Sequence, residues 1–136
     1  MKMLLMAIGL LSIGGTSPAL ALDLQGHRGG RGLAPENTLP AFATALSLGV
    51  TTLELDTGIT KDGVVVIAHD PTLNPDITRD KNGARLERRG PAIHALTLAE
   101  LQQYDVGRLK PGTDYAKRYP QQKPADGTRI HSGIDP

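Results

Sequence analysis

Apolar residues recur with a helical period in the first third of the chain. They fall at i, i+3, i+4 and i+7, which places them on one face of a helix: Leu39, Phe42, Ala43 and Leu46. Asn37 or Thr38 offers a side-chain cap at the start, and Gly49 suits the position after the end. The pattern therefore predicts an amphipathic helix over residues 38–48.

Strand-like segments lie on both sides of this helix. Residues 22–25 form a short, partly apolar run, and residues 50–60 are rich in β-branched side chains. A second β-branched run, 64–68, follows Asp62-Gly63, a dipeptide typical of tight hairpin turns. The sequence thus predicts a strand, a helix, a second strand and then a hairpin.

Periodicity is lost beyond the hairpin. Residues 70–90 carry Gly, Pro and Asn with no helical or strand period, which predicts a long connection. Thr97 and Glu100 have the spacing of a capping box, so we expect a short helix with Leu98 and Leu101 on its apolar face.

The N-terminus has the pattern of a secretory signal peptide. Lys2 precedes an apolar run over residues 3–13, and small residues lead to Ala19-Leu20-Ala21, an A-x-A cleavage site. The run is shorter than the roughly 20 residues that span a bilayer, and the alternative is an uncleaved membrane anchor. We expect residues 1–21 to be removed and the mature chain, 22–136, to be periplasmic or secreted without a stable membrane anchor.

Composition excludes several classes of function. The chain has 136 residues, with 15 Lys and Arg against 14 Asp and Glu, and aromatic residues make up 3%. A near-neutral chain with so few aromatic rings is not expected to bind nucleic acid. The absence of cysteine excludes disulfides, thiolate metal sites and a cysteine nucleophile.

A pair of acids in the second predicted strand is the first candidate for chemistry. Glu54 and Asp56 are two residues apart, so both side chains of a strand would point to one face. The two charges repel unless a cation lies between them, and a metal ion is one such cation. A solvated strand edge that carries two acids is the plainer alternative.

The predicted hairpin adds a histidine to this pair. A two-residue loop at Asp62-Gly63 pairs Lys61 with Val64, and the same register places Asp56 opposite His69. A histidine beside two carboxylates is a candidate general acid or base, or a metal ligand. A bulge or a longer loop would change this register, and His69 would then be a polar residue at a strand end.

A glycine-rich loop after the first strand carries two further candidates. His27 and Arg28 lie in the run Gly26-His27-Arg28-Gly29-Gly30, in which glycine allows close approach of the backbone and a positive φ. The planar fork of Arg28 suits a phosphate or a carboxylate, although an ordinary turn has a similar composition. Glu36 and Asn37 precede the predicted helix, either as caps or as part of a site.

Several motifs in order resemble the glycerophosphodiester phosphodiesterase family over about residues 24 to 80: His27-Arg28-Gly29, Pro35-Glu36-Asn37-Thr38, Glu54-x-Asp56, Thr60-Lys61-Asp62-Gly63 and His69-Asp70. The resemblance implies the N-terminal part of a TIM-type (β/α) barrel, an α/β fold with its site at the C-terminal ends of the strands. It also implies a divalent metal, calcium ahead of magnesium, and hydrolysis of a small-molecule glycerophosphodiester to glycerol 3-phosphate and an alcohol.

The resemblance also implies roles for individual residues. The two catalytic histidines of the family fall on His27 and His69, and its phosphate-binding arginine falls on Arg28. Its first two metal carboxylates fall on Glu54 and Asp56. A third metal carboxylate, a Glu on a later strand, has no recognisable counterpart after His69.

Length separates this chain from a whole barrel. A (β/α) barrel takes about 250 residues, so the expectation is a truncated form of the enzyme. Two alternatives stay open: a secreted module that binds glycerophosphodiesters without cleaving them, and a non-functional remnant. Two retained histidines argue against the binding module, because binding alone needs no proton transfer.

The first prediction concerns export. Expression in a bacterial host with its secretion pathway should yield mature protein that begins at Leu22, because cleavage follows Ala21. Intact-mass spectrometry of the periplasmic fraction measures this directly. A full-length mass in the membrane fraction would contradict it.

Overall fold

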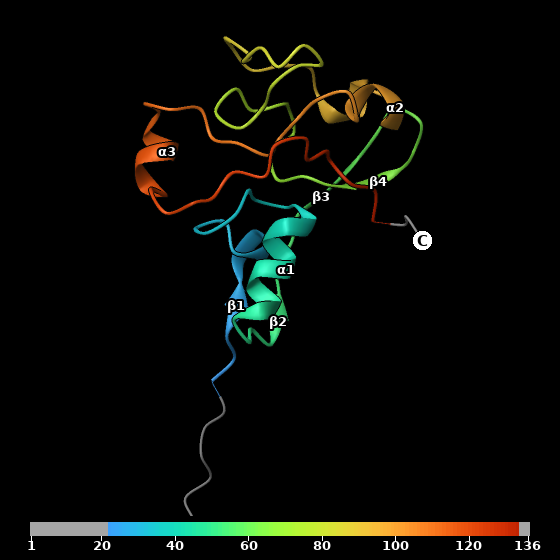
Figure 1. Ribbon diagram of the computed structural model, residues 1–136. Helices are drawn as coiled ribbons and strands as arrows, with labels where there is room; N and C mark the ends of the chain where they lie inside the picture. Colours follow the sequence, from blue (N-terminus) through green and yellow to red (C-terminus); the bar gives the residue numbers. More distant parts are fainter. Residues whose placement is uncertain (1–21, 134–136) are drawn as a thin grey trace, which may run out of the picture.

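The computed structural model describes residues 22–133, and the predicted signal peptide lies outside the described residues (Figure 1). No helix within 22–133 is long and apolar enough to cross a membrane. The chain begins with a strand–helix–strand unit and continues into a loop-rich part that packs around its own core (Figure 1).

The first unit is built from β1 (Gln25–Gly26), α1 (Leu39–Ser47) and β2 (Thr52–Leu53). β1 and β2 pair in parallel, and α1 lies in the connection between them, as parallel pairing requires. The Thr38 hydroxyl accepts a hydrogen bond from the Ala41 amide and caps α1. The predicted helix is therefore confirmed, while the predicted first strand is reduced to two residues.

The buried face of α1 differs from the predicted one. Ala41, Phe42 and Ala45 are buried, whereas Leu39 and Leu46 are exposed. The cause is the partner of the helix, the glycine-rich turn η1 (His27–Gly29). A Cβ on Gly29 would lie 2.7 Å from the Phe42 ring, so only a glycine backbone lets the helix approach this closely.

The predicted strand over 50–60 is divided into β2 and β3 (Thr57–Ile59). The Glu54 amide still donates to the Gly26 carbonyl, whereas the Asp56 carbonyl accepts from the Ala68 amide on the other side. Residues 54–56 thus cross from one ladder to the next. Glu54 and Asp56 do not lie within a strand, and the prediction that one strand carries both was wrong.

The hairpin register also differs from the prediction. β3 pairs antiparallel with β4 (Val65–Ile67), with Thr57 opposite Ile67 and Ile59 opposite Val65. Thr60 then closes the loop on Val64, and Gly63 adopts a φ of 81°. The loop has three residues because Lys61 is unpaired, so Asp56 is not opposite His69. A bulged turn with a left-handed glycine produces this one-residue shift.

The core lies in the loop-rich part. Val66, Leu73, Leu101, Val106 and Ile130 are buried there together with Ile93 of η2 (Ile93–Ala95). Leu101 belongs to α2 (Leu98–Leu101), whose predicted capping box between Thr97 and Glu100 is present in full. The last helix is α3 (Asp114–Arg118), capped by Thr113.

An ionic cluster fastens the late segments of this part. Arg79 donates to both Asp105 and Asp126, and Arg108 donates to Asp126. The hydrogen bonds from Arg108 hold the pKa of Asp126 well below its usual range. Burial opposes ionisation of Asp105, but the amides of Gly107 and Gly127 together with Arg79 outweigh it and lower the pKa of Asp105. These carboxylates contribute stability at neutral pH that is lost as the pH falls through their lowered pKa values.

The second prediction tests the contact between the turn and α1. Gly29→Ala should lower the free energy of unfolding by about 3 kcal/mol, because the new methyl group overlaps Phe42 in a left-handed backbone. Gly63→Ala is the matched control: Gly63 has a similar φ, but its Cβ would meet open space, so only about 1 kcal/mol of strain is expected. Urea unfolding followed by circular dichroism measures both. Equal losses would contradict the packing role of Gly29.

Candidate active site

The turn after β1 places Arg28 in an uncommon conformation. Its φ of 52° and ψ of 38° lie in the left-handed region, which costs a non-glycine residue energy. Two backbone hydrogen bonds maintain the turn: the Asn37 amide donates to the Arg28 carbonyl at 2.9 Å, and the Gly29 amide donates to the Glu54 carbonyl at 3.2 Å. Asn37 is also left-handed, with a φ of 53°. Backbone of this kind persists only where neighbours hold it.

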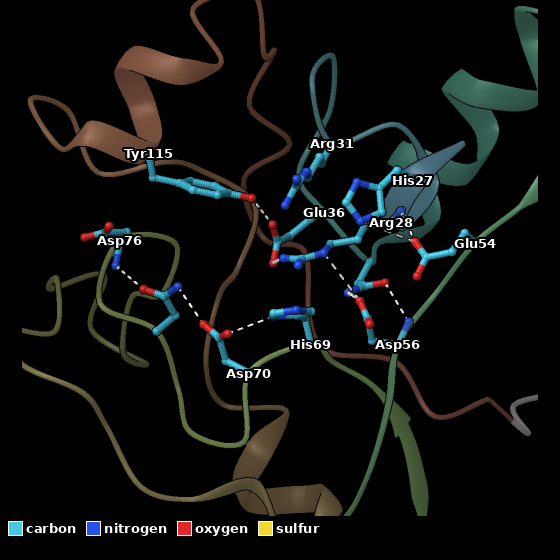
Figure 2. A network of polar contacts seen from close by, with 12 residues as sticks. His27, Arg28, Arg31, Glu36, Glu54, Asp56, His69, Asp70, Asp76 and Tyr115 are labelled. Carbon is cyan, nitrogen blue, oxygen red and sulfur yellow. Dashed lines mark hydrogen bonds and ion pairs between the residues drawn. The ribbon is translucent and has the colours of Figure 1, made fainter. Parts of the chain in front are cut away.

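Three carboxylates surround Arg28 (Figure 2). Its backbone N–H donates to Glu54 Oε2 at 2.7 Å, and its Nη1 donates to Glu36 Oε1 at 3.1 Å. Its Nε lies 3.4 Å from Asp56 Oδ2. The Arg28 side chain is 11% exposed, so the guanidinium is oriented by charge in a site with little water. The cation expected near the two acids is, within this chain, the arginine.

Asn37 fixes the second acid. Its Nδ2 donates to Asp56 Oδ2 at 3.2 Å, and its Oδ1 accepts from the Asp56 amide at 3.4 Å. Thr38 rather than Asn37 caps α1, so the Asn37 amide is available to the site. Of the two uses that the sequence left open for Asn37, the structure favours the site.

Glu36 is a buried acid in contact with the late part of the chain. The residue is 8% exposed, and burial raises the pKa of its carboxyl while the neighbouring Arg28 charge lowers it in part. Its Oε2 accepts a hydrogen bond from the Tyr115 hydroxyl of α3 (Figure 2). Sequence reasoning missed Tyr115, because the polar, irregular segment around it carries no motif.

His69 is oriented by the next residue. Its Nδ1 lies 2.8 Å from Asp70 Oδ1, and Asn74 Nδ2 donates to Asp70 Oδ2 at 2.7 Å. An ionised carboxylate only accepts, so a hydrogen bond between an ionised Asp70 and this ring requires the tautomer with its proton on Nδ1, which leaves Nε2 as the free nitrogen. The ring faces the group formed by Arg28 and Asp56 (Figure 2). The sequence shows Asp70 only as part of a motif, and its contact with the His69 ring is found in the structure.

His27 stands at the exposed side of the site. Its Nε2 is 3.8 Å from Glu54 Oε2, and its side chain is 55% exposed. A separate cavity of about 40 Å³ does not include His27. Its lining combines polar residues with apolar core residues: Glu36, Asn37, His69 and Asp70 with Leu73 and Ile93. Of the five predicted site residues, four are linked by contacts around Arg28, and His69 borders the cavity that Glu36 and Asn37 also line.

The donors present fit one side of a site for a hard divalent cation. The described contacts use only Oε2 of Glu54 and Oδ2 of Asp56, so each carboxylate keeps a second oxygen, the ligand type that calcium and magnesium prefer. Among residues 22–133, no group of three or more His, Asp or Glu side chains is arranged to hold a metal. Glu54 and Asp56 by themselves thus offer two carboxylate oxygens that make no described contact.

Comparison with known proteins shows which family has this sequence and fold. Residues 27–131 match the model of the glycerophosphoryl diester phosphodiesterase family, which is most of the chain. The chain belongs to this family. It is 38% identical over 90 residues to a glycerophosphodiester phosphodiesterase of Caldanaerobacter subterraneus subsp. tengcongensis, covering 66% of this chain and 32% of the relative. Glycerophosphodiester phosphodiesterase 1 of Rattus norvegicus is 51% identical over 57 residues, which are 42% of this chain and 17% of the relative.

Solved structures of the family agree with the fold. A Silicibacter pomeroyi protein named for the same family superposes with a TM-score of 0.81 at 39% identity, covering 85% of this chain and 39% of that one. An Oleispira antarctica phosphodiesterase, solved with the product sn-glycerol-3-phosphate, gives a TM-score of 0.56 at 30% identity, covering 82% and 37%. The expected fold class is confirmed: the chain corresponds to part of a TIM-type barrel and spans about a third of the length of these relatives.

Proposed function

We propose that this chain provides the phosphate-binding and proton-transfer part of a glycerophosphodiester phosphodiesterase, which hydrolyses its substrate to glycerol 3-phosphate and an alcohol. The observation that supports this most is the setting of Arg28, a nearly buried guanidinium oriented by carboxylates beside two histidines. Arg28 lies in a turn with left-handed backbone, and within residues 22–133 its guanidinium donates a hydrogen bond to Glu36 alone.

Arg28 binds the phosphodiester in this proposal. Glu36 engages one Nη1 proton, and the remaining N–H groups of the fork match the non-bridging phosphate oxygens in geometry and charge. Negative charge grows on those oxygens as the phosphorus is attacked. A guanidinium already oriented in a poorly hydrated site stabilises that charge without reorganisation.

The histidines transfer the protons. With the His69 Nδ1 proton held by Asp70, Nε2 accepts a proton from the water that attacks the phosphorus. His27 Nε2 lies 3.8 Å from Glu54 Oε2, and in this proposal His27 donates a proton to the oxygen of the leaving alcohol. The two rings belong to separate segments, which suits proton transfer at opposite ends of one phosphodiester.

Glu54 and Asp56 hold a divalent cation in the same proposal, with calcium ahead of magnesium because calcium accepts looser oxygen geometry. When bound, such an ion neutralises phosphate charge as a Lewis acid. Glu54 and Asp56 also orient the Arg28 backbone and side chain, so they act on the phosphate even without the ion. We further propose export to the periplasm or medium, on the basis of the N-terminal sequence pattern.

The third prediction concerns turnover. The chain alone should release no glycerol 3-phosphate from glycerophosphocholine with calcium, because no group of three or more His, Asp or Glu side chains within residues 22–133 is arranged to hold a metal. Fusion to the part of the Silicibacter pomeroyi protein that this chain does not cover should restore hydrolysis. In that fusion, His27→Ala and His69→Ala should each lower turnover by about 10²- to 10⁴-fold.

His94→Ala is the matched control for these variants, since His94 is an exposed histidine of η2. It should leave turnover unchanged. Wild-type turnover in both the His27 and the His69 variants would refute the proposed proton transfers. Metal-dependent hydrolysis by the chain alone would refute the expectation that this part is inactive by itself.

The fourth prediction separates the metal role from the proton-transfer role. In the fusion, Glu54→Gln should raise the calcium concentration needed for half-maximal activity by at least tenfold, because an amide oxygen replaces a charged ligand. Excess calcium should restore much of the rate. His69→Ala should show no such rescue, and a calcium dependence unchanged in Glu54→Gln would remove Glu54 from the metal site.

A further inference from the structure

Tyr115 is far from the other site residues in sequence but reaches the centre of the site. It lies in α3, 79 positions after Glu36, and its hydroxyl donates to Glu36 Oε2 (Figure 2). The other oxygen of the same carboxylate accepts from Arg28 Nη1 at 3.1 Å. Glu36 therefore connects the phenol to the guanidinium, one oxygen for each.

Burial gives this connection its importance. Glu36 is 8% exposed and the Arg28 side chain 11%, so water does not readily replace a lost partner. A buried carboxylate oxygen without a donor is costly, and the side chain would rotate or take up a proton. Either response changes the hold on Arg28. Asp56 does not compensate, because Arg28 Nε lies near it without forming a hydrogen bond within the described residues.

The segment that carries Tyr115 is itself fixed to the glycine-rich turn. Gln122 Nε2 donates to the Arg31 carbonyl at 2.7 Å, and the Lys123 amide donates to the Leu33 carbonyl at 2.9 Å. The Tyr119 ring packs edge-on against Tyr115 with centroids 5.1 Å apart, and the Arg31 guanidinium lies 5.3 Å from the Tyr119 ring. These contacts place the phenol hydroxyl against Glu36 without relying on the hydroxyl itself.

We propose that Tyr115 is a positioning residue for phosphate binding: its hydroxyl fixes Glu36, and Glu36 fixes the fork of Arg28. The inference rests on the proposed role of Arg28. Tyr115 does not contact the phosphate in this account. Tyr115 instead sets the direction of the Arg28 N–H groups that bind the phosphate. The direction of these groups therefore depends on the placement of residues 113–123.

The fifth prediction tests this on the full chain by NMR. Titration with sn-glycerol 3-phosphate in the presence of calcium should shift the Arg28 Nε–Hε signal in a saturable way. Tyr115→Phe should weaken binding by about tenfold, the equivalent of one hydrogen bond to a charged group. Without ligand, the same variant should already shift or broaden the Arg28 signal, because the fork is less firmly held.

Tyr119→Phe is the matched control. It keeps the ring, and the Tyr119 hydroxyl makes no hydrogen bond within residues 22–133, so affinity should be unchanged. In a Glu36→Gln background, Tyr115→Phe should have a clearly smaller effect than in the wild type, because the coupling runs through the carboxylate. Equal losses in both backgrounds, or wild-type affinity in Tyr115→Phe, would overturn the proposal.

Phosphate binding by Arg28 and the positioning role of Tyr115 have separate readouts in these spectra. A wild-type chain with no saturable shift at Arg28 would refute phosphate binding by Arg28. The signal of the ligand-free Arg28 side chain would still test the positioning role. An Arg28 signal that is identical in wild type and Tyr115→Phe would refute that role whether or not phosphate binds.

Discussion

A guanidinium with little access to water imposes the main constraint on this part of the molecule. A buried positive charge is tolerated only when acids and hydrogen bonds compensate it. Arg28 obtains Glu36 and Asp56 for its side chain and Glu54 for its backbone. These acids come from the loop before α1 and from the crossover between two ladders. The first unit must therefore bring both segments to Arg28 in order to compensate its charge.

The balance of charge explains why such a group suits phosphate chemistry. One arginine does not neutralise three nearby carboxylates, so a further positive charge close to Glu54 and Asp56 would reduce the excess negative charge. The burial of Glu36 raises its pKa and moderates the excess from within. In the proposed function, a divalent cation at Glu54 and Asp56 supplies this positive charge when the phosphodiester binds.

Sequence reasoning succeeded where the signal was local. The helix capped by Thr38 and the capping box at Thr97 depend on residues within one turn, and both are present. It failed where one residue decided between two geometries: the three-residue loop at Gly63 moved His69 out of register with Asp56. The buried face of α1 was also missed, because the choice of Ala41 over Leu39 depends on the glycine turn that packs against it.

Glu54 and Asp56 lie near each other for a reason other than strand alternation. Glu54 and Asp56 meet around Arg28 although no strand contains them. The ordered motifs indicated Glu54 and Asp56 in the sequence, whereas no motif indicated the contact between Tyr115 and Glu36. A pairing across 79 positions is set by tertiary packing alone.

That separation has a consequence for the order of folding. The turn at Arg28 and the helix that follows are joined by contacts close in sequence, which form early, whereas the bond from Tyr115 closes a long loop and forms late. During synthesis the Glu36 carboxylate therefore gains its contact with the phenol only after a further 79 residues have been added to the chain.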